Sequence, residues 1–223
     1  MRIRTIALLI AAPLLAAKNE PVERLHEAGA VFSEIMAAPD KGIPQDLLEK
    51  AHCVVIVPGL KKGAFIVGAK YGKGFIVCRK GAGGWSAPAA VRIEGGSFGF
   101  QIGASETDVA LLVTNERGAD RLLSSQFTLG GEGEVAGGPV GRSATAQTDA
   151  KLTAEILSWS RSRGVFAGIS LQGATLRQDL DDNAALYGKK LENREIVRGN
   201  VAPPKAAARL LGLLSKYSAH KKA

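Results

Sequence analysis

Basic residues gather in two stretches of this chain that contain no acidic residue. Seven of the 29 Lys and Arg residues lie between Ala51 and Ile93, and six more follow Glu195, the last acidic residue. The packing of a hydrophobic core does not explain why the charged side chains of a stretch are all positive, whereas the binding of anions at its surface does. The pattern therefore predicts an anion-binding surface. The alternative is a solvated positive face without a specific ligand.

The residues that we expect to carry this chemistry come from both stretches. Each exposed Lys or Arg contributes about 1 kcal/mol to attachment at an anionic phospholipid surface, so several together predict useful but salt-sensitive binding. Aromatic residues make up only 5% of the chain, which argues against a nucleic-acid binder that stacks bases. The candidate lipid-binding residues are Lys61, Lys62, Lys70, Lys73, Arg79, Lys80, Lys205, Arg209 and Lys216.

One segment, Gly95 to Gly99, matches the Gly-x-Ser-x-Gly pattern of a hydrolase nucleophile. That chemistry places Ser97 on a turn between a strand and a helix, with an acid and a His later in the chain. The residues after Ser97 have the pattern of a strand, and the only later His is His220, close to the C-terminus. A glycine bend between strands is therefore the better interpretation, and we expect no catalytic triad.

Metal and nucleotide sites find no support in the residue spacing. The three His and two Cys are scattered, without the spacing of a zinc site. The acidic segment 179–183 lacks the glycine and distal Glu of a calcium loop, and helix capping by Asp181 or Asp182 explains it. The glycine-rich segment 131–138 carries glutamates that would repel phosphate. We therefore expect a non-enzymatic protein without a metal or cofactor.

The first 17 residues have the pattern of an export signal. Arg2 and Arg4 form a short basic region, and the twelve residues from Ile6 to Ala17 carry no charge. A bilayer crossing needs about 20 residues, so the segment is too short to span one. We expect a signal peptide at 1–17, a single domain at 18–223, and a periplasmic or secreted protein that associates peripherally with membranes. An uncleaved hydrophobic anchor is the alternative.

The two cysteines become relevant because a disulfide persists outside the cytoplasm. Cys53 opens one apolar run and Cys78 closes another, two strand lengths later. In a simple meander they would lie two strands apart, too far for a bond. Two buried free thiols are the expected state, with a disulfide as the alternative.

The elements that position these residues are predicted from hydrophobic periodicity. Residues 20–37 have the spacing of an amphipathic helix with an acidic exposed face, and a short helix follows Pro44. From Cys53 the period changes to that of glycine-rich strands, with a hairpin turn expected at 71–74 and another turn at 81–84. A short helix capped by Asn115, further strands, a helix near 183–187 and a final helix after Pro204 follow. The fold class is α+β, with a curved, largely antiparallel, half-barrel-like sheet flanked by N-terminal helices and one C-terminal helix.

Several motifs occur in an order that resembles the SYLF domain. Their order and number make the resemblance specific, and it extends over roughly residues 22 to 215. The motifs are Trp85-Ser-Ala-Pro88, Gly95-Gly-Ser-Phe-Gly-Phe-Gln-Ile-Gly103, Ala136-Gly-Gly-Pro-Val-Gly-Arg142, Ser158-Trp-Ser-Arg-Ser-Arg-Gly-Val-Phe-Ala-Gly168, Gly173 and Tyr187-Gly188.

The resemblance implies binding to anionic phospholipids, and to actin in yeast members, without catalysis. In eukaryotic members a basic N-terminal helix inserts into membranes, whereas the corresponding helix here carries Glu20, Glu23, Glu27 and Glu34. An exported protein would meet neither actin nor phosphoinositides. The leading hypothesis is therefore binding of anionic phospholipid surfaces. The alternatives are a carrier that holds one apolar ligand inside the curved sheet, and a protein-interaction module.

The final helix leaves two interpretations open. Lys205, Arg209 and Lys216 fall on one stripe of residues 204–218, and Leu210, Leu213, Leu214 and Tyr217 fall on the opposite stripe. Such a helix can lie in the headgroup region of a membrane, in which case deletion of residues 204–223 weakens binding and leaves a folded domain. Alternatively, the leucines pack on the sheet and the basic residues are solvated.

Overall fold

The computed structural model describes residues 12–38, 42–64, 67–81, 83–98, 103–132, 134–138, 154–162, 165–166 and 171–218, of which 12–19, 64, 67, 97–98, 103–104 and 165–166 are described by their backbone alone. Most of the expected signal segment lies outside them. The first half contains α1 (Ala12–Ala37), α2 (Gln45–Lys50), β1 (Cys53–Ala64), β2 (Val67–Cys78), β3 (Ala89–Phe98), β4 (Gly103–Val113) and α3 (Glu116–Leu122). The second half contains β5 (Gln126–Thr128), β6 (Val135–Gly137), β7 (Ile156–Ser162), β8 (Val165–Phe166), β9 (Thr175–Gln178), α5 (Leu180–Tyr187), α6 (Asn193–Arg198), a 3₁₀ turn at Lys205–Ala207 and α7 (Ala208–Tyr217).

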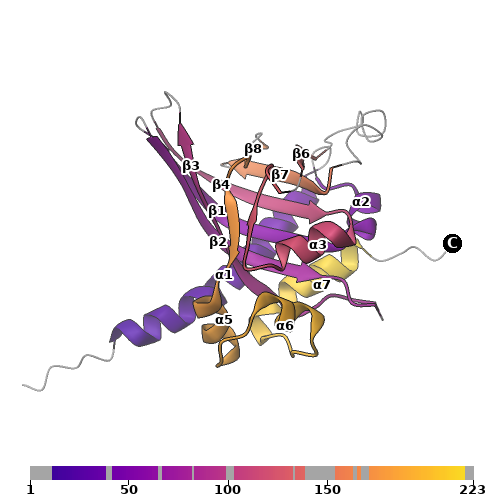
Figure 1. Ribbon diagram of the computed structural model, residues 1–223. Helices are drawn as coiled ribbons and strands as arrows, with labels where there is room; N and C mark the ends of the chain where they lie inside the picture. Colours follow the sequence, from indigo (N-terminus) through magenta and orange to yellow (C-terminus); the bar gives the residue numbers. More distant parts are fainter. Residues whose placement is uncertain are drawn as a thin grey trace, which may run out of the picture.

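The strands form one curled sheet in the order β5-β9-β3-β2-β1-β4-β7-β6, with β8 paired to β7. Every pairing is antiparallel except that of β6 with β7. Helices cover the sheet on both faces (Figure 1). The predicted α+β class with a curved, half-barrel-like and largely antiparallel sheet is confirmed.

Two hydrophobic clusters lie on the two faces of the sheet because successive strand residues point to opposite sides. On the face that we call the helix face, Val54, Ile56 and Phe75 pack against α1, α2 and α7. On the opposite, concave face, which we call the inner face, Val55 and Ile76 pack beneath α3 and α6. The sheet is therefore the middle layer between two cores.

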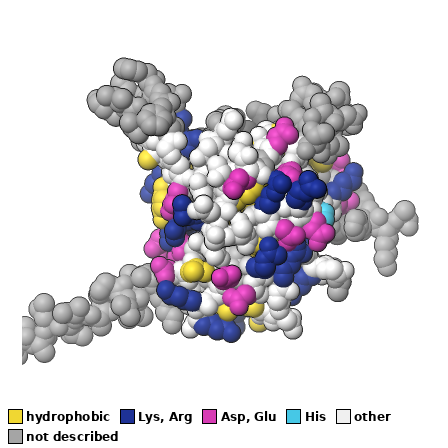
Figure 2. All heavy atoms as spheres, viewed as in Figure 1, with side chains coloured by type: hydrophobic (Ala, Val, Ile, Leu, Met, Phe, Trp, Pro, Cys, Tyr) yellow, Lys and Arg dark blue, Asp and Glu magenta, His cyan; other side chains and the backbone are white. Residues whose placement is uncertain are grey.

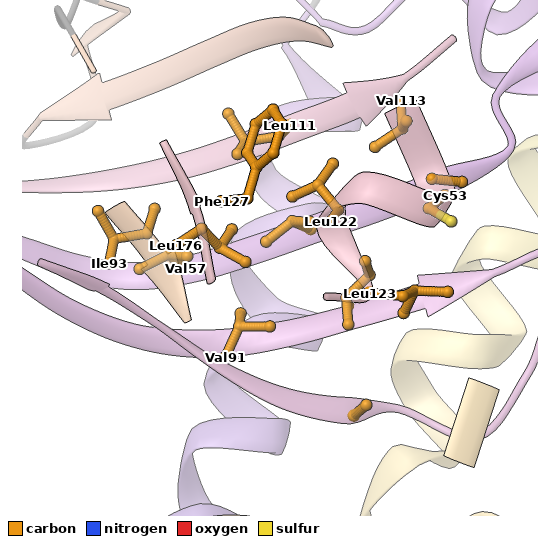
Figure 3. Packing of buried hydrophobic residues seen from close by; sticks show 14 of the residues in the cluster. Cys53, Val57, Val91, Ile93, Leu111, Val113, Leu122, Leu123, Phe127 and Leu176 are labelled. Atoms are coloured by element: carbon orange, nitrogen blue, oxygen red, sulfur yellow. The ribbon is translucent and has the colours of Figure 1, made fainter. Parts of the chain in front are cut away.

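The inner face is filled by the protein's own side chains. Figure 3 shows Val91, Leu111, Phe127 and Leu176 pointing into the space beneath α3, and these residues are at most 2% exposed. Glycines here allow close packing: a Cβ on Gly74 would lie 2.0 Å from the carbonyl oxygen of Ile56. These side chains pack together beneath α3, in the region where the carrier hypothesis would place its ligand.

The structure corrects the expected strand boundaries. The hairpin turn expected at 71–74 is wrong, because β2 runs without interruption from Val67 to Cys78 and pairs with β3 in one register from Val67 to Ile76. The partner strand β1 is equally long, with a bulge of one residue between Val57 and Leu60. The strand expected from Phe98 to Ala104 lies partly outside the described residues.

The expectation of two free thiols is also wrong. Because β1 and β2 are neighbours, Cys53 pairs directly with Cys78, and their sulfur atoms form a disulfide with a Cα–Cα distance of 3.9 Å. The expected meander counted β2 as two short strands and so placed the cysteines too far apart. The bond closes the end of the β1–β2 hairpin nearest α2.

Several predicted helices are present, and one capping assignment changes. Asn115 caps α3 by accepting a hydrogen bond from the Gly118 N–H, as expected. The cap of α5 is Asp179, not Asp181 or Asp182 as predicted. Residues 95–98 belong to strand β3, so the segment around Ser97 is not the strand-to-helix turn of a hydrolase. None of the described helices combines the length and apolar character that a membrane crossing requires.

Candidate functional site

An open groove with a volume of about 1390 Å³ lies between α1 and the helix face of β1, β2, β4 and β7. Its α1 wall is acidic, because Glu20, Glu23, Glu27 and Glu34 recur on one side of that helix. Its opposite wall, formed by the strands and bordered by Lys62 at the end of β1, carries residues of both signs and an exposed tyrosine: Lys61, Lys73, Arg161, Glu106, Asp108 and Tyr71. The α1 wall is therefore mainly acidic, whereas the strand wall carries both signs of charge.

An ion-pair network closes the groove near the start of α5. The Lys73 ammonium lies 2.9 Å from an Asp179 carboxylate oxygen and 3.0 Å from one of Asp182, and Asp182 also accepts a hydrogen bond from Arg24 of α1. Burial alone would raise the pKa of Asp179, but hydrogen bonds from Lys73 and from the Asp182 N–H hold it below its ordinary value. Lys73 is thus engaged in holding α1, β2 and α5 together.

A second tie joins α1 to the sheet farther along the groove. Arg161 of β7 forms an ion pair with Glu34 of α1 and another, at 3.1 Å, with Asp108 of β4. Asp108 also accepts a hydrogen bond from the Gly59 N–H, at the bulge of β1. These contacts fix the floor of the groove beside the bulge.

Three predicted lysines gather where β1 and β2 run beyond the helices. We call residues 60–64 and 67–71 the open end of the hairpin; Figure 1 shows this end of the sheet at the upper left. The register pairs Lys61 with Tyr71 on the helix face and Lys62 with Lys70 on the inner face. Tyr71, at 47% exposed, is the most exposed large apolar side chain among the described residues.

Arg79 and Lys80 lie at the opposite end of the same hairpin. The Arg79 guanidinium donates hydrogen bonds to the Ala51 and Leu48 carbonyls and stacks over the Trp85 ring at 4.6 Å. The Trp85 indole N–H in turn donates to the Ser218 hydroxyl at the end of α7. We call this end of the hairpin, where Cys53 and Cys78 form a disulfide, the closed end. Arg79 there joins α2, β2 and, through Trp85, α7.

The basic stripe of the final helix is exposed, and its apolar stripe is core. Lys205, Arg209 and Lys216 are exposed, whereas Leu210 and Leu214 are fully buried against α1 and the sheet. The ring of Tyr217 packs edge-on against Phe32 of α1 at 6.3 Å. The interpretation in which this helix places its leucines in a membrane is therefore wrong, because those leucines complete the helix-face core.

The nine candidate residues therefore fall into separate groups, and sequence reasoning missed some of their neighbours. Tyr71 and Ser105 carry no sequence signal of a site; only strand register brings them to the open end. The acidic wall was visible in the spacing of the α1 glutamates, but its position beside the lysines was not. On the face drawn in Figure 2, basic and acidic side chains are interspersed. Within the described residues, no group of three metal-ligating side chains occurs.

This fold, with its charged groove and lysine-bearing open end, is that of a binding module. Residues 94–217 match the family model Ysc84, described as "Las17-binding protein actin regulator". The chain belongs to this Ysc84 (SYLF) family, and the resemblance noted from its motifs is confirmed.

Similar proteins occur in animals and fungi. The chain is 33% identical over 190 residues to rat SH3 domain-containing YSC84-like protein 1, covering 84% of this chain and 56% of the relative. It is 35% identical over 179 residues to LAS seventeen-binding protein 3 of Saccharomyces cerevisiae, covering 78% and 39%. The chain thus spans about half the length, or less, of these relatives. Their names describe binding proteins rather than enzymes, which supports a binding or protein-interaction module.

Proposed function

We propose that this protein is an exported, non-enzymatic module that binds anionic phospholipid surfaces through the open end of its β1–β2 hairpin. The observation that carries the proposal is the position of exposed Lys61 beside exposed Tyr71 at one extremity of the sheet, with partly exposed Lys62 next to them in β1. A convex or flat membrane can reach an extremity of the molecule without entering a cleft.

The residue types at the open end suit a membrane interface. Tyrosine places an apolar ring and a polar hydroxyl at the level of the headgroups, and lysine extends its ammonium toward phosphate while its stem covers apolar surface. Lys61 and Tyr71 lie side by side on the helix face, and Glu106 is the acidic residue paired with Lys61 across β1 and β4. With about 1 kcal/mol for each lysine, attachment is salt-sensitive.

The remaining candidates have different parts in the proposal. Lys205, Arg209 and Lys216 add long-range attraction from the surface of α7, and Lys80 does so from the closed end. Lys73 and Arg79 serve the fold, because their charged groups already bind carboxylates and carbonyls. Export agrees with the Cys53–Cys78 disulfide, since such bonds persist in oxidising compartments.

Vesicle sedimentation tests the proposal. Phosphatidylcholine vesicles with and without 30% phosphatidylglycerol are mixed with the protein at two salt concentrations. We expect binding only with phosphatidylglycerol and low salt, and a severalfold loss for the double variant Lys61→Met/Tyr71→Ser. Lys190→Met is the matched control, since Lys190 is an exposed lysine in the loop between α5 and α6. Absence of binding at low salt, or equal losses in both variants, would overturn the proposal.

A protein-interaction module is the second candidate, favoured by the description of the family as Las17-binding. The surface that suits it is the acidic wall of the groove, which would take a basic segment of a partner. Crosslinking in membrane-free extract of the source cells tests this candidate. A partner lost with Glu23→Gln/Glu27→Gln and retained with Lys61→Met/Tyr71→Ser supports it; a partner retained by both variants does not.

A further inference from the structure

Two arginines face each other on neighbouring strands of the sheet, outside the groove. Arg92 of β3 pairs with Arg177 of β9. The residues next to them in the chain, Ile93 and Leu176, belong to the inner core, so strand alternation places both arginines on the helix face. The lining of the groove comes from α1, β1, β2, β4 and β7, not from β3 or β9. The arginine pair is therefore a separate feature of the surface.

The two guanidinium groups share one carboxylate. Glu94 lies two residues after Arg92 on the same face, and its oxygens are 2.6 Å from Nε of Arg92 and 3.4 Å from Nε of Arg177. Lys73, which pairs with Arg92 from β2, is already held by two carboxylates at the start of α5. Among the described residues, neither arginine forms an ion pair with a second carboxylate. The two arginines and Glu94 together thus carry one net positive charge.

The arginines keep most of their hydrogen-bond donors unused. The Nε atoms of Arg92 and Arg177 are buried, and neither has a hydrogen-bond acceptor among the described residues, although both lie in ion-pair contact with Glu94. No described residue accepts a hydrogen bond from their terminal nitrogens either. A guanidinium has five N–H donors in one plane. Because the two side chains are 34% and 42% exposed, a ligand can reach the terminal nitrogens from solvent.

The neighbours of the pair connect it to the proposed membrane contact. Exposed Tyr71 of β2 lies opposite Glu94, so the arginines are one row of the sheet away from the Lys61–Tyr71 surface. On the other side, exposed Gln126 of β5 pairs with Arg177 and offers a neutral amide donor. Two planar cations thus lie between an amphipathic ring and an amide on one face.

We propose that Arg92 and Arg177 form a binding site for a phosphodiester group. A guanidinium presents parallel N–H donors that match two oxygens of a phosphate, and Glu94 holds the two forks side by side. The single net charge of the cluster matches the single negative charge of a phosphodiester better than the double charge of a phosphomonoester. The inference deepens the proposed function, on which its membrane form rests, because it names the headgroup chemistry that is recognised.

The phosphodiester can belong to a soluble compound or to a lipid headgroup, and both carry the same chemistry. Two experiments distinguish these sources. The first titrates the protein with glycerophosphoglycerol, or with acetate at equal ionic strength, and follows the Nε–H signals of the two arginines by NMR. Burial of these nitrogens slows their exchange with water, which keeps the signals visible. The second is sedimentation with vesicles that contain phosphatidylglycerol, at low salt.

The variants separate shape from charge. Arg92→Lys and Arg177→Lys keep both positive charges but replace each planar fork by a single ammonium. We expect the double variant Arg92→Lys/Arg177→Lys to bind glycerophosphoglycerol about tenfold more weakly, because bidentate hydrogen bonds to a charged group are lost. Vesicle binding should fall severalfold. Arg194→Lys is the matched control and should change neither, since Arg194 is an exposed arginine of α6 that pairs with Asp120.

Circular dichroism reports whether the double variant folds. If it does not, Arg177→Lys alone provides the result, because Arg177 is the more exposed of the pair. The single variant removes one of the two forks, so a smaller loss in the same direction is expected. Equal binding of wild type and Arg177→Lys would then contradict the proposal.

Each outcome bears on the proposal. A loss of vesicle binding by the double variant, relative to Arg194→Lys, assigns the site to a lipid headgroup; a loss confined to glycerophosphoglycerol assigns it to a soluble phosphodiester. Equal binding of wild type and double variant in both experiments, or acetate binding as tight as that of glycerophosphoglycerol, would overturn the site. Vesicle binding that still depends on Lys61 and Tyr71 would in that case leave the proposed function standing. Conversely, glycerophosphoglycerol binding without any vesicle binding would retain the site and overturn the proposed function.

Discussion

The closed and open ends of the β1–β2 hairpin lie about 36 Å apart if a strand rises about 3.3 Å per residue. At the closed end a disulfide joins the strands, and Arg79 donates to carbonyls of α2 and stacks on Trp85. At the open end Lys62 faces Lys70, and Lys61 lies beside exposed Tyr71. Both ends come from the same acid-free stretch.

The difference shows that one-signed charge in a sequence can serve two purposes. Arg79 and Lys73 find carbonyl and carboxylate partners contributed by other elements, so the fold neutralises them without any acid in their own stretch. At the open end, Lys62 and Lys70 are paired across the two strands. The charges of Lys73 and Arg79 thus contribute to the stability of the fold, whereas exposed Lys61 at the open end belongs to the proposed membrane contact.

The largest expected effect comes from the core beside the closed end. Leu214→Ala should lower the free energy of unfolding by about 2–5 kcal/mol, because it leaves a cavity between α7 and α1. Removal of residues 204–223 should abolish the folded state. Urea unfolding followed by circular dichroism measures both, with Lys216→Ala as the exposed control. A folded truncated chain would show that α7 is not part of the core.

Loss of the disulfide should have the next largest effect. Replacing Cys53 and Cys78 by Ala removes the link that closes a loop of 25 residues. The free energy of unfolding should fall by about 2–4 kcal/mol. Because the open end is remote from the bond, vesicle binding below the unfolding transition should be unchanged. Urea unfolding and sedimentation of the double variant check the two halves of this prediction. A parallel loss of binding would mean that the two ends are coupled.

The substitution Asp179→Asn should lower the free energy of unfolding by a smaller amount, about 1–2 kcal/mol. It removes a charge-assisted hydrogen bond from Lys73, while asparagine can still cap α5. The pKa of Asp179 is lower in the folded than in the unfolded chain. Its contribution is therefore present above the unfolded pKa, near 4, and is lost as the pH falls through the folded pKa.

Unfolding measured from pH 7 down to pH 3 tests this sign. The stability difference between wild type and Asp179→Asn should be full at neutral pH and shrink below about pH 4. A difference that stays constant over this range would show that Asp179 does not contribute through its charge. Lys61→Met, at the open end, should leave stability unchanged throughout.

Sequence reasoning succeeded where a local signal suffices. The α+β class, the Asn115 cap, the final helix after Pro204 and the family follow from periodicity, capping chemistry and ordered motifs. The glycines at 71–74 led to the wrong prediction of a hairpin turn, because glycine is common both in turns and in strands that pack closely. Gly74 lacks a side chain because the Ile56 backbone occupies that space, which only the folded structure reveals.

The candidate site shows the same limit more sharply. Alternation counted straight from buried Val57 would place Lys61 on the inner face and Lys62 on the helix face. The one-residue bulge before Leu60, where Gly59 has a φ of 58°, reverses that assignment. The spacing of the lysines does not indicate the bulge. The faces on which Lys61 and Lys62 lie could therefore not be predicted from the sequence alone.

The Cys53–Cys78 bond also makes the hairpin a closed covalent ring that contains Lys61, Lys62, Lys70 and Lys73. A protease that cuts once at any of these lysines opens the ring without dividing the molecule, since the sulfur bridge still joins the two fragments. The exposed extremity can therefore be cut by a protease and remain attached to its own core. Only reduction followed by unfolding would release the two pieces.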